Sequence, residues 1–193
     1  MKTVIRATAV LIAIGVAGCQ DTVAPTQAVR SAPAFDQTGD NGATAVTGNG
    51  VFSLAGLNVQ FDAYVIRGGD GTALGTFNQR ADEGEGVVID FDANVTCLAV
   101  DPVNHRAWLG GTVTRNGSTD PDYMTDINQP GQDIWFRVLD PGNGPQGGDR
   151  STFLGFKGSA GFPTSAAYCA GMPWAPDNAR TWPVVSGGIH VHP

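Results

Sequence analysis

Alternating apolar residues and glycine-rich turns constrain the fold of this chain more than any other feature. The segment Asn58–Ile66 alternates along its length, which places its apolar residues from Val59 to Val65 on one face of a strand. The turn Gly68–Gly71 contains residues that tolerate positive φ, and residues 74–80 then form the returning strand of a hairpin. The 27 glycines and 12 prolines argue against a helical bundle, because both residues disfavour helix interiors.

The same patterning predicts strands over most of the remaining chain. We expect them at residues 87–92, 94–100, 106–114, 133–139, 151–156 and 184–192, the first two being either separate or one strand broken by a bulge. The pair Gly110-Gly111 predicts a bulge or a sharp bend, and residues 165–169 a short helical turn. A total of about eight or nine strands predicts an all-β domain, either a single antiparallel barrel or a sandwich. The barrel is favoured because the last strand could close against the first.

The amino terminus has the three parts of a secretory signal. Lys2 and Arg6 are followed by an apolar run over residues 7–16 and then by the small residues Ala17 and Gly18. An apolar run of this length is well short of the roughly 20 residues that cross a bilayer. We therefore expect export rather than a membrane-spanning helix.

The residues at the expected cleavage site, Val16-Ala17-Gly18-Cys19, resemble the lipobox of bacterial lipoproteins. The resemblance implies removal of residues 1–18, a diacylglyceryl group on the Cys19 thiol and acylation of the new amino terminus, with palmitate as a typical chain. Two or more acyl chains hold a protein stably on a membrane, so the anchor needs no spanning helix. Because Gln20 and not aspartate follows the cysteine, the resemblance also implies the outer membrane if the bacterium has one. The alternative is an ordinary secreted protein with a free Cys19 thiol.

A segment of small, polar and proline residues separates Cys19 from the expected domain. Residues 20–48 show no sustained apolar period. We therefore expect residues 19–48 to form a lipidated, flexible tether and residues 49–193 to form a single β domain. The alternative for the end of the tether is an additional edge strand near residues 43–47.

The chain has three cysteines, of which two remain if Cys19 carries the lipid. An even pair in an exported chain indicates a disulfide, here between Cys97 and Cys169. The alternative is two separate buried thiols. Catalysis by either is disfavoured, since Cys97 lies in an apolar run where a thiol is inert.

The chain is acidic, with a formal net charge of −7 that becomes −9 when Lys2 and Arg6 leave with the signal. An acidic exported domain does not attract nucleic acid through bulk charge, so nucleic-acid partners are excluded. We expect a monomer whose partner is the membrane, through the lipid, together with an unidentified small molecule or envelope component.

Two groups of residues are candidates for a site. His190 and His192 share one face of the expected final strand and His105 lies in a turn, so these three are candidate ligands of a transition metal. The alternative is that the histidines are surface residues. Trp174 and Trp182 are candidates for lining a cleft that binds an apolar ligand or a sugar, and the alternative for them is the core.

Motifs of catalysis are missing from the sequence. There is no G-x-S-x-G, and Asp90 and Asp92 share a strand face without a visible partner for acid–base work. We therefore assign no catalytic residue and no cofactor.

Three segments of the expected domain resemble a group of secreted bacterial proteins of unknown function. They are Asn94–Val100, Ala107–Thr114 and Ile134–Asp140, matching V-T-C-L, A-W-x-G-G and F-x-V-x-D motifs in this order. The resemblance implies a small all-β domain over roughly residues 50–192 and fits a disulfide at Cys97. These are strand and turn motifs, so no site residue follows from them.

We expect a cell-envelope lipoprotein whose β domain has a binding or structural role rather than a catalytic one. One alternative is a metal-assisted hydrolase that uses the three histidines. The other is a lipocalin-like carrier, which requires a closed barrel with an apolar cavity for a small ligand.

Overall fold

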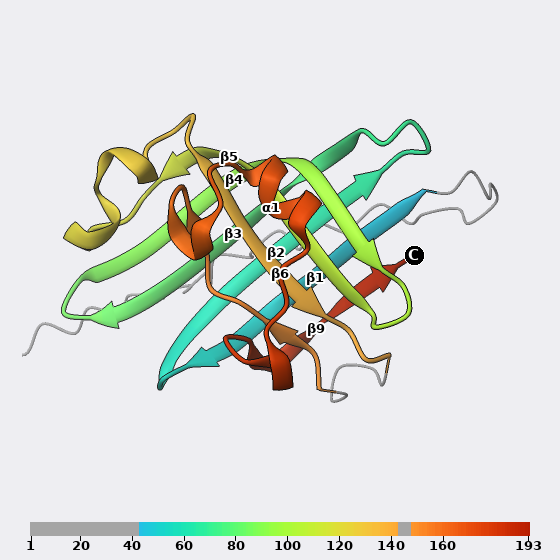
Figure 1. Ribbon diagram of the computed structural model, residues 1–193. Helices are drawn as coiled ribbons and strands as arrows, with labels where there is room; N and C mark the ends of the chain where they lie inside the picture. The colour runs from blue at the N-terminus through green and yellow to red at the C-terminus, as the bar shows by residue number, and fades with distance from the viewer. Residues whose placement is uncertain (1–42, 143–147) are drawn as a thin grey trace, which may run out of the picture. The chain divides into compact units, whose positions relative to one another are not determined.

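The computed structural model describes residues 43–142 and 148–193, which are mainly β-strands (Figure 1). The strands are β1 (Thr44–Leu54), β2 (Leu57–Arg67), β3 (Ala73–Gly84), β4 (Val87–Asp101), β5 (Arg106–Asn116), β6 (Asp133–Leu139), β7 (Arg150–Ser151), β8 (Gly155–Phe156) and β9 (Trp182–His192). The helix α1 (Ser165–Gly171) follows β8, and short 3₁₀ turns lie at Pro121–Tyr123, Asp126–Asn128, Ser159–Gly161 and Pro176–Asn178. Within the described residues, no helix is long and apolar enough to cross a membrane. The signal, the lipobox with Cys19 and most of the expected tether lie outside them.

The strands form one antiparallel sheet that closes into a barrel. Their order is β5-β4-β3-β2-β1-β9-β7-β6-β8, and β5 also pairs with β6. The result is a barrel of eight strands with β8 as a further short strand on β6. β9 pairs with β1 from Ala45↔His192 to Phe52↔Val184. The predicted all-β class and the closure of the last strand against the first are thus confirmed, and the fold is the barrel rather than the sandwich.

The first strand begins earlier than the sequence indicated. β1 starts at Thr44, so the boundary expected at residue 49 is too late. Residues 44–47 are not the additional edge strand of the alternative either, because they belong to one longer strand that pairs with both β2 and β9. Two glycines of β1, Gly48 and Gly50, face the backbone of β9 so closely that a Cβ atom at either would collide with it. Glycine here permits close strand pairing.

Irregular pairing modifies two of the other predicted strands. Residues 87–101 form one strand, β4, with two register shifts, and the second of these lies opposite the Gly110-Gly111 pair. The strand expected at residues 151–156 is divided into β7 and β8. Between them, the Thr152 amide and hydroxyl hydrogen-bond the backbone of Arg137 on β6, so this segment still follows β6.

Two buried carboxylates complete the barrel where strand pairing stops. β9 pairs with β7 only through its first two residues. Further along the same edge, the amides of Ile189 and Val191 donate to Asp149 Oδ2 and Asp140 Oδ2, both at 2.9 Å. Burial raises the pKa of Asp149 above its usual range, and the nearby Asp140 charge adds to this. Side chains therefore satisfy edge amides that would otherwise be buried without acceptors.

Aromatic rings fill the barrel interior. Phe77 of β3 and Phe136 of β6 have ring centroids 4.7 Å apart, and Phe91 of β4 lies 5.0 Å from Phe156 of β8. All four belong to one buried core. These contacts join strands that are not neighbours in the sheet. The rings therefore occupy space that an enclosed ligand would need in a lipocalin-like carrier.

A second, smaller cluster lies on the outer side of the barrel. It consists of Trp108 of β5, Trp135 of β6 and Tyr168 of α1, and the rings of Trp135 and Tyr168 stack at 5.3 Å. The helix lies against β4, β5 and β6 (Figure 1). β5 is therefore covered on both faces, which explains why its central residues are buried without alternation.

A disulfide between Cys97 and Cys169 fastens α1 to this outer wall, as the sequence predicted. The two Cα atoms are 6.2 Å apart, with Cys97 on β4 and Cys169 on the helix. Gly110 makes the close approach feasible, since a Cβ there would lie 2.8 Å from the Cys97 sulfur and 2.9 Å from the Ser165 Cβ. The close approach at Gly110 and the disulfide together hold α1 against β4 and β5.

Candidate functional site

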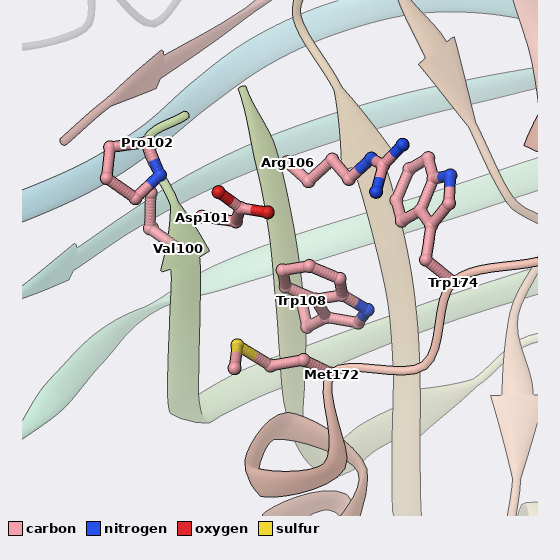
Figure 2. Close-up of a pocket in the computed structure, with 7 residues that line it drawn as sticks. All are labelled: Val100, Asp101, Pro102, Arg106, Trp108, Met172 and Trp174. Carbon is pink, nitrogen blue, oxygen red and sulfur yellow. The ribbon is translucent and has the colours of Figure 1, made fainter. Parts of the chain in front are cut away.

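A cleft of about 370 Å³ opens on the outer wall, beside the cluster beneath α1 (Figure 2). Its lining consists of Val100, Asp101, Pro102, Arg106, Trp108, Met172 and Trp174. Figure 2 shows the end of β4 on one side, Trp174 on the other, and Arg106 and Trp108 of β5 between them. The volume is within the range of small-molecule sites, about 300–1,000 Å³. The lining is mainly apolar with two charged groups, a composition that can hold an apolar body and orient it by charge.

Several contacts hold the Trp174 side chain in place at one side of the cleft. Its ring centre lies 4.5 Å from the Arg106 guanidinium carbon and 5.1 Å from that of Arg137, both within cation–π range. Its indole N–H donates to Asn178 Oδ1 at 3.0 Å, and its ring meets Trp108 edge-on at 5.7 Å. The indole is therefore held by hydrogen bonding and by packing.

Arg106 retains its capacity to bind an acceptor. Within residues 43–142 and 148–193, its guanidinium takes part in none of the ion pairs, which involve Arg80 and Arg115. Its buried Nε has no hydrogen-bond acceptor there. The Asp101 carboxylate lies near enough to interact with the guanidinium electrostatically, so the cleft contains one cation and one anion rather than a net positive charge.

Asp101 supplies the opposite charge. It is the cross-strand partner of Arg106 at the end of the β4–β5 hairpin. Its carboxylate accepts from the side chain and amide of Asn104 and from the amide of Val103. These bonds, that from the Asn104 side chain first, lower the pKa of Asp101. The carboxylate is thus held by the turn and stays ionised at neutral pH.

Met172 enters the cleft from a strained backbone position. It caps the end of α1 at φ 42° and ψ 52°, in the left-handed region where glycine is the usual residue. A side chain in this region costs about 1–2 kcal/mol. The helix end does not require methionine, and the side chain is 46% exposed at the cleft.

The structure separates the two tryptophans that the sequence singled out. Trp174 lines the cleft, whereas Trp182 at the start of β9 packs against Phe52, with ring centroids 6.4 Å apart. Trp182 therefore belongs to the edge of the barrel core. The second indole of the cleft is Trp108.

The three histidines do not form one site. His190 and His192 are exposed on β9 with ring centroids 6.2 Å apart, and His105 is exposed in the β4–β5 turn with φ 52°. In the part of the chain that the structure describes, no three His, Cys, Asp or Glu residues are grouped so that they could hold a metal ion. The metal-assisted hydrolase gains no support from this arrangement.

Asp90 and Asp92 form an ion-pair network rather than an acid–base pair. Arg115 binds both carboxylates, and Arg80 also reaches Asp90. Burial by itself would raise the pKa of Asp90, but the hydrogen bonds from Arg115 and Asn78 outweigh it and lower that pKa. A carboxylate held ionised in this way stabilises the β3–β5 surface and is a poor general acid.

Comparisons of the chain with protein-family models, curated proteins and solved structures gave no match. Any function must therefore be inferred from the residues of this chain. Sequence reasoning missed Arg106, Trp108 and Met172 as members of the cleft. The alternation of β5 could have placed Arg106 and Trp108 on one face, but the position of Met172 depends on how α1 packs.

Proposed function

We propose that this protein is a lipid-anchored component of the cell envelope whose β-barrel binds a small molecule in the outer cleft. Cys19 would carry the lipid, and the residues that precede β1 would act as the tether. The outer membrane is the expected location in a bacterium that has one. The role is binding, with no reaction assigned.

The observation that carries the binding role is the guanidinium of Arg106, which lines a mainly apolar cleft and forms none of the ion pairs within the described residues. A few charged groups in a mainly apolar lining are typical of small-molecule sites. A β-barrel is compatible with a binding or carrier role, and the aromatic contacts inside this barrel favour an external site. A ligand in the cleft would meet Arg106 and cover the apolar walls.

The anchor is tested by Cys19→Ala in the full chain expressed in its bacterial host. We expect the wild type to partition into the detergent phase and the variant into the aqueous phase, since two or more acyl chains are needed for stable anchoring. Mass spectrometry of the wild type should show the added lipid. Equal partitioning of the two proteins would contradict lipid anchoring.

Binding in the cleft is tested by the indole N–H signals in an NMR spectrum of the full chain during a small-fragment screen. Ligands of the cleft should shift the signals of Trp108 and Trp174, whose rings line it. Trp182 is the internal control because it packs in the barrel core. A screen in which no fragment shifts the two cleft signals would refute the binding role.

A further inference from the structure

We infer that the cleft binds a small monocarboxylate with an apolar or aromatic body, whose carboxylate pairs with Arg106 while its body lies against Met172, above the buried ring of Trp108. This inference rests on the proposed binding function and adds the chemical class of the ligand.

The Arg106 guanidinium is held against the Trp174 ring. The Arg106 guanidinium carbon lies 4.5 Å from the centre of the Trp174 ring, which is a cation–π contact. A planar carboxylate accepts two parallel N–H bonds from a guanidinium. Because Trp174 already holds the guanidinium, the pair forms without ordering a free side chain.

The charged residues Asp101 and Arg106 bear on the charge of the ligand. Asp101 and Arg106 are directly opposite each other in the β4–β5 ladder, and both line the cleft. A ligand with one negative charge is attracted by the guanidinium. The Asp101 carboxylate repels any anion, and this repulsion scales with ligand charge in the same way as the attraction by Arg106, so the pair alone does not set the number of charges. The mainly apolar lining favours a single charge, because a multiply charged head loses more hydration on entering it.

The rest of the lining bears on the body of the ligand. Apart from the two charged residues, the lining consists of apolar or aromatic side chains from the end of β4, from β5 and from the segment after α1. Trp108 is buried beneath the cleft, with its indole N–H donating to the Pro173 carbonyl at 2.8 Å. Its polar atom is thus satisfied, and the residue is only 2% exposed, so it closes the floor of the cleft. Met172 offers a ligand more apolar surface, and ligand atoms that cover it gain from burial rather than from hydrogen bonds.

The experiment is isothermal titration calorimetry of the full chain in detergent with three matched probes. They are 4-phenylbutanoate, the neutral 4-phenylbutanamide and the cationic 4-phenylbutylamine, which share one body and differ in the polar head. The acid should bind at least about 10-fold more tightly than the amide, because its bonds to the guanidinium are charge-assisted. The amine should bind more weakly than the amide.

Two variants locate the effect. Arg106→Gln should lower the affinity for the acid to that for the amide and leave the amide unchanged. Arg180→Gln, the matched control, removes an exposed arginine that does not line the cleft and should keep the preference for the acid. If Arg106→Gln kept that preference, Arg106 would not be the carboxylate partner.

Met172→Gly tests the apolar wall without a folding penalty. Glycine relieves the left-handed strain at φ 42°, so the variant should melt at the same or a higher temperature than the wild type. It should nevertheless bind the acid and the amide more weakly, by a similar factor for both. Unchanged affinity would show that the body of the ligand does not use this wall.

The outcomes separate the ligand class from the binding function. Equal affinity of acid and amide, with shifts of the Trp108 and Trp174 signals, would overturn the carboxylate inference and keep the cleft as a binding site. Failure of all three probes, with fragments of other chemistry shifting those signals, would do the same. Failure of the probes and of every fragment would overturn both.

Discussion

Removal of the Cys97–Cys169 disulfide has an effect whose size follows from the chain. The two cysteines are 72 residues apart. In the chain-entropy model, a closed loop of this length removes enough freedom from the unfolded chain to stabilise the fold by about 4 kcal/mol. For a domain of this size, a loss of 1 kcal/mol lowers Tm by about 2–4 °C. We therefore expect Cys97→Ala/Cys169→Ala to melt about 8–16 °C below the oxidised wild type.

The double alanine variant isolates the crosslink because it removes little volume. Each substitution deletes one sulfur atom, and neither creates a buried polar group. The wild type in the presence of a reducing phosphine is the control, since it loses the crosslink without a change of sequence. Differential scanning calorimetry of the three samples gives the Tm values, and mass spectrometry after alkylation shows whether the thiols are free.

The local consequence should be greatest at the end of α1. Its first turn stays attached without the disulfide, because the Ser165 amide and hydroxyl both donate to Asp133 at 2.7 Å. The end that leads to Met172 loses its covalent link to β4. The far-UV spectrum of the barrel should persist below Tm, while ligand binding in the cleft weakens. If the reduced wild type, with both thiols shown to be free, melted less than about 2 °C below the oxidised protein, the loop-entropy reasoning would be refuted.

Three further predictions concern Gly110, Asp149 and the ion pair between Asp90 and Arg115. Gly110→Ala should lower the free energy of unfolding by about 1–3 kcal/mol in urea titrations, since its Cβ would collide with Cys97; an unchanged midpoint would contradict the close approach. Asp149 has a raised pKa, so its protonation favours the folded state; the stability of Asp149→Asn relative to wild type should fall as pH drops from 7 to 4, and a flat difference would refute this. Asp90 has a lowered pKa and stabilises the fold above the unfolded value of about 3.9; in acid titrations, Arg115→Gln should lose stability at neutral pH and depend less on pH below about 4.

The all-β class was predictable from the sequence because several strands alternate between a buried and an exposed face. Asn58–Ile66 shows this alternation, and the structure places it in β2. β1 was not predicted as a strand, because Gly48 and Gly50 interrupt its apolar pattern. Their reason is the close backbone of β9. That contact joins opposite ends of the domain, so no local pattern reports it.

The cleft was only partly predictable for the same physical reason. Trp174 could be named as a candidate because aromatic side chains commonly line ligand clefts, but the same reasoning also named Trp182, which packs against the barrel core. The partners of Trp174 depend on long-range packing. Trp108 lies on the outer face of a barrel strand, and α1 buries it. The floor of the site thus forms only when α1 packs on β5, and a local sequence pattern does not report that contact.

The outer wall also shows why the cleft is more than a packing defect. α1 buries Trp108, Trp135 and Tyr168 as a second core, and a core of that kind is complete without a charged neighbour. Arg106 is nevertheless placed at its edge with a buried Nε that has no acceptor in the described chain, and Met172 occupies a backbone conformation suited to glycine. Each feature costs stability, and each also occurs elsewhere, at Arg137 Nε and in the left-handed backbone of Arg180. What sets the cleft apart is that both features line one mainly apolar hollow, where a ligand could use the charge of Arg106 and the exposed side chain of Met172.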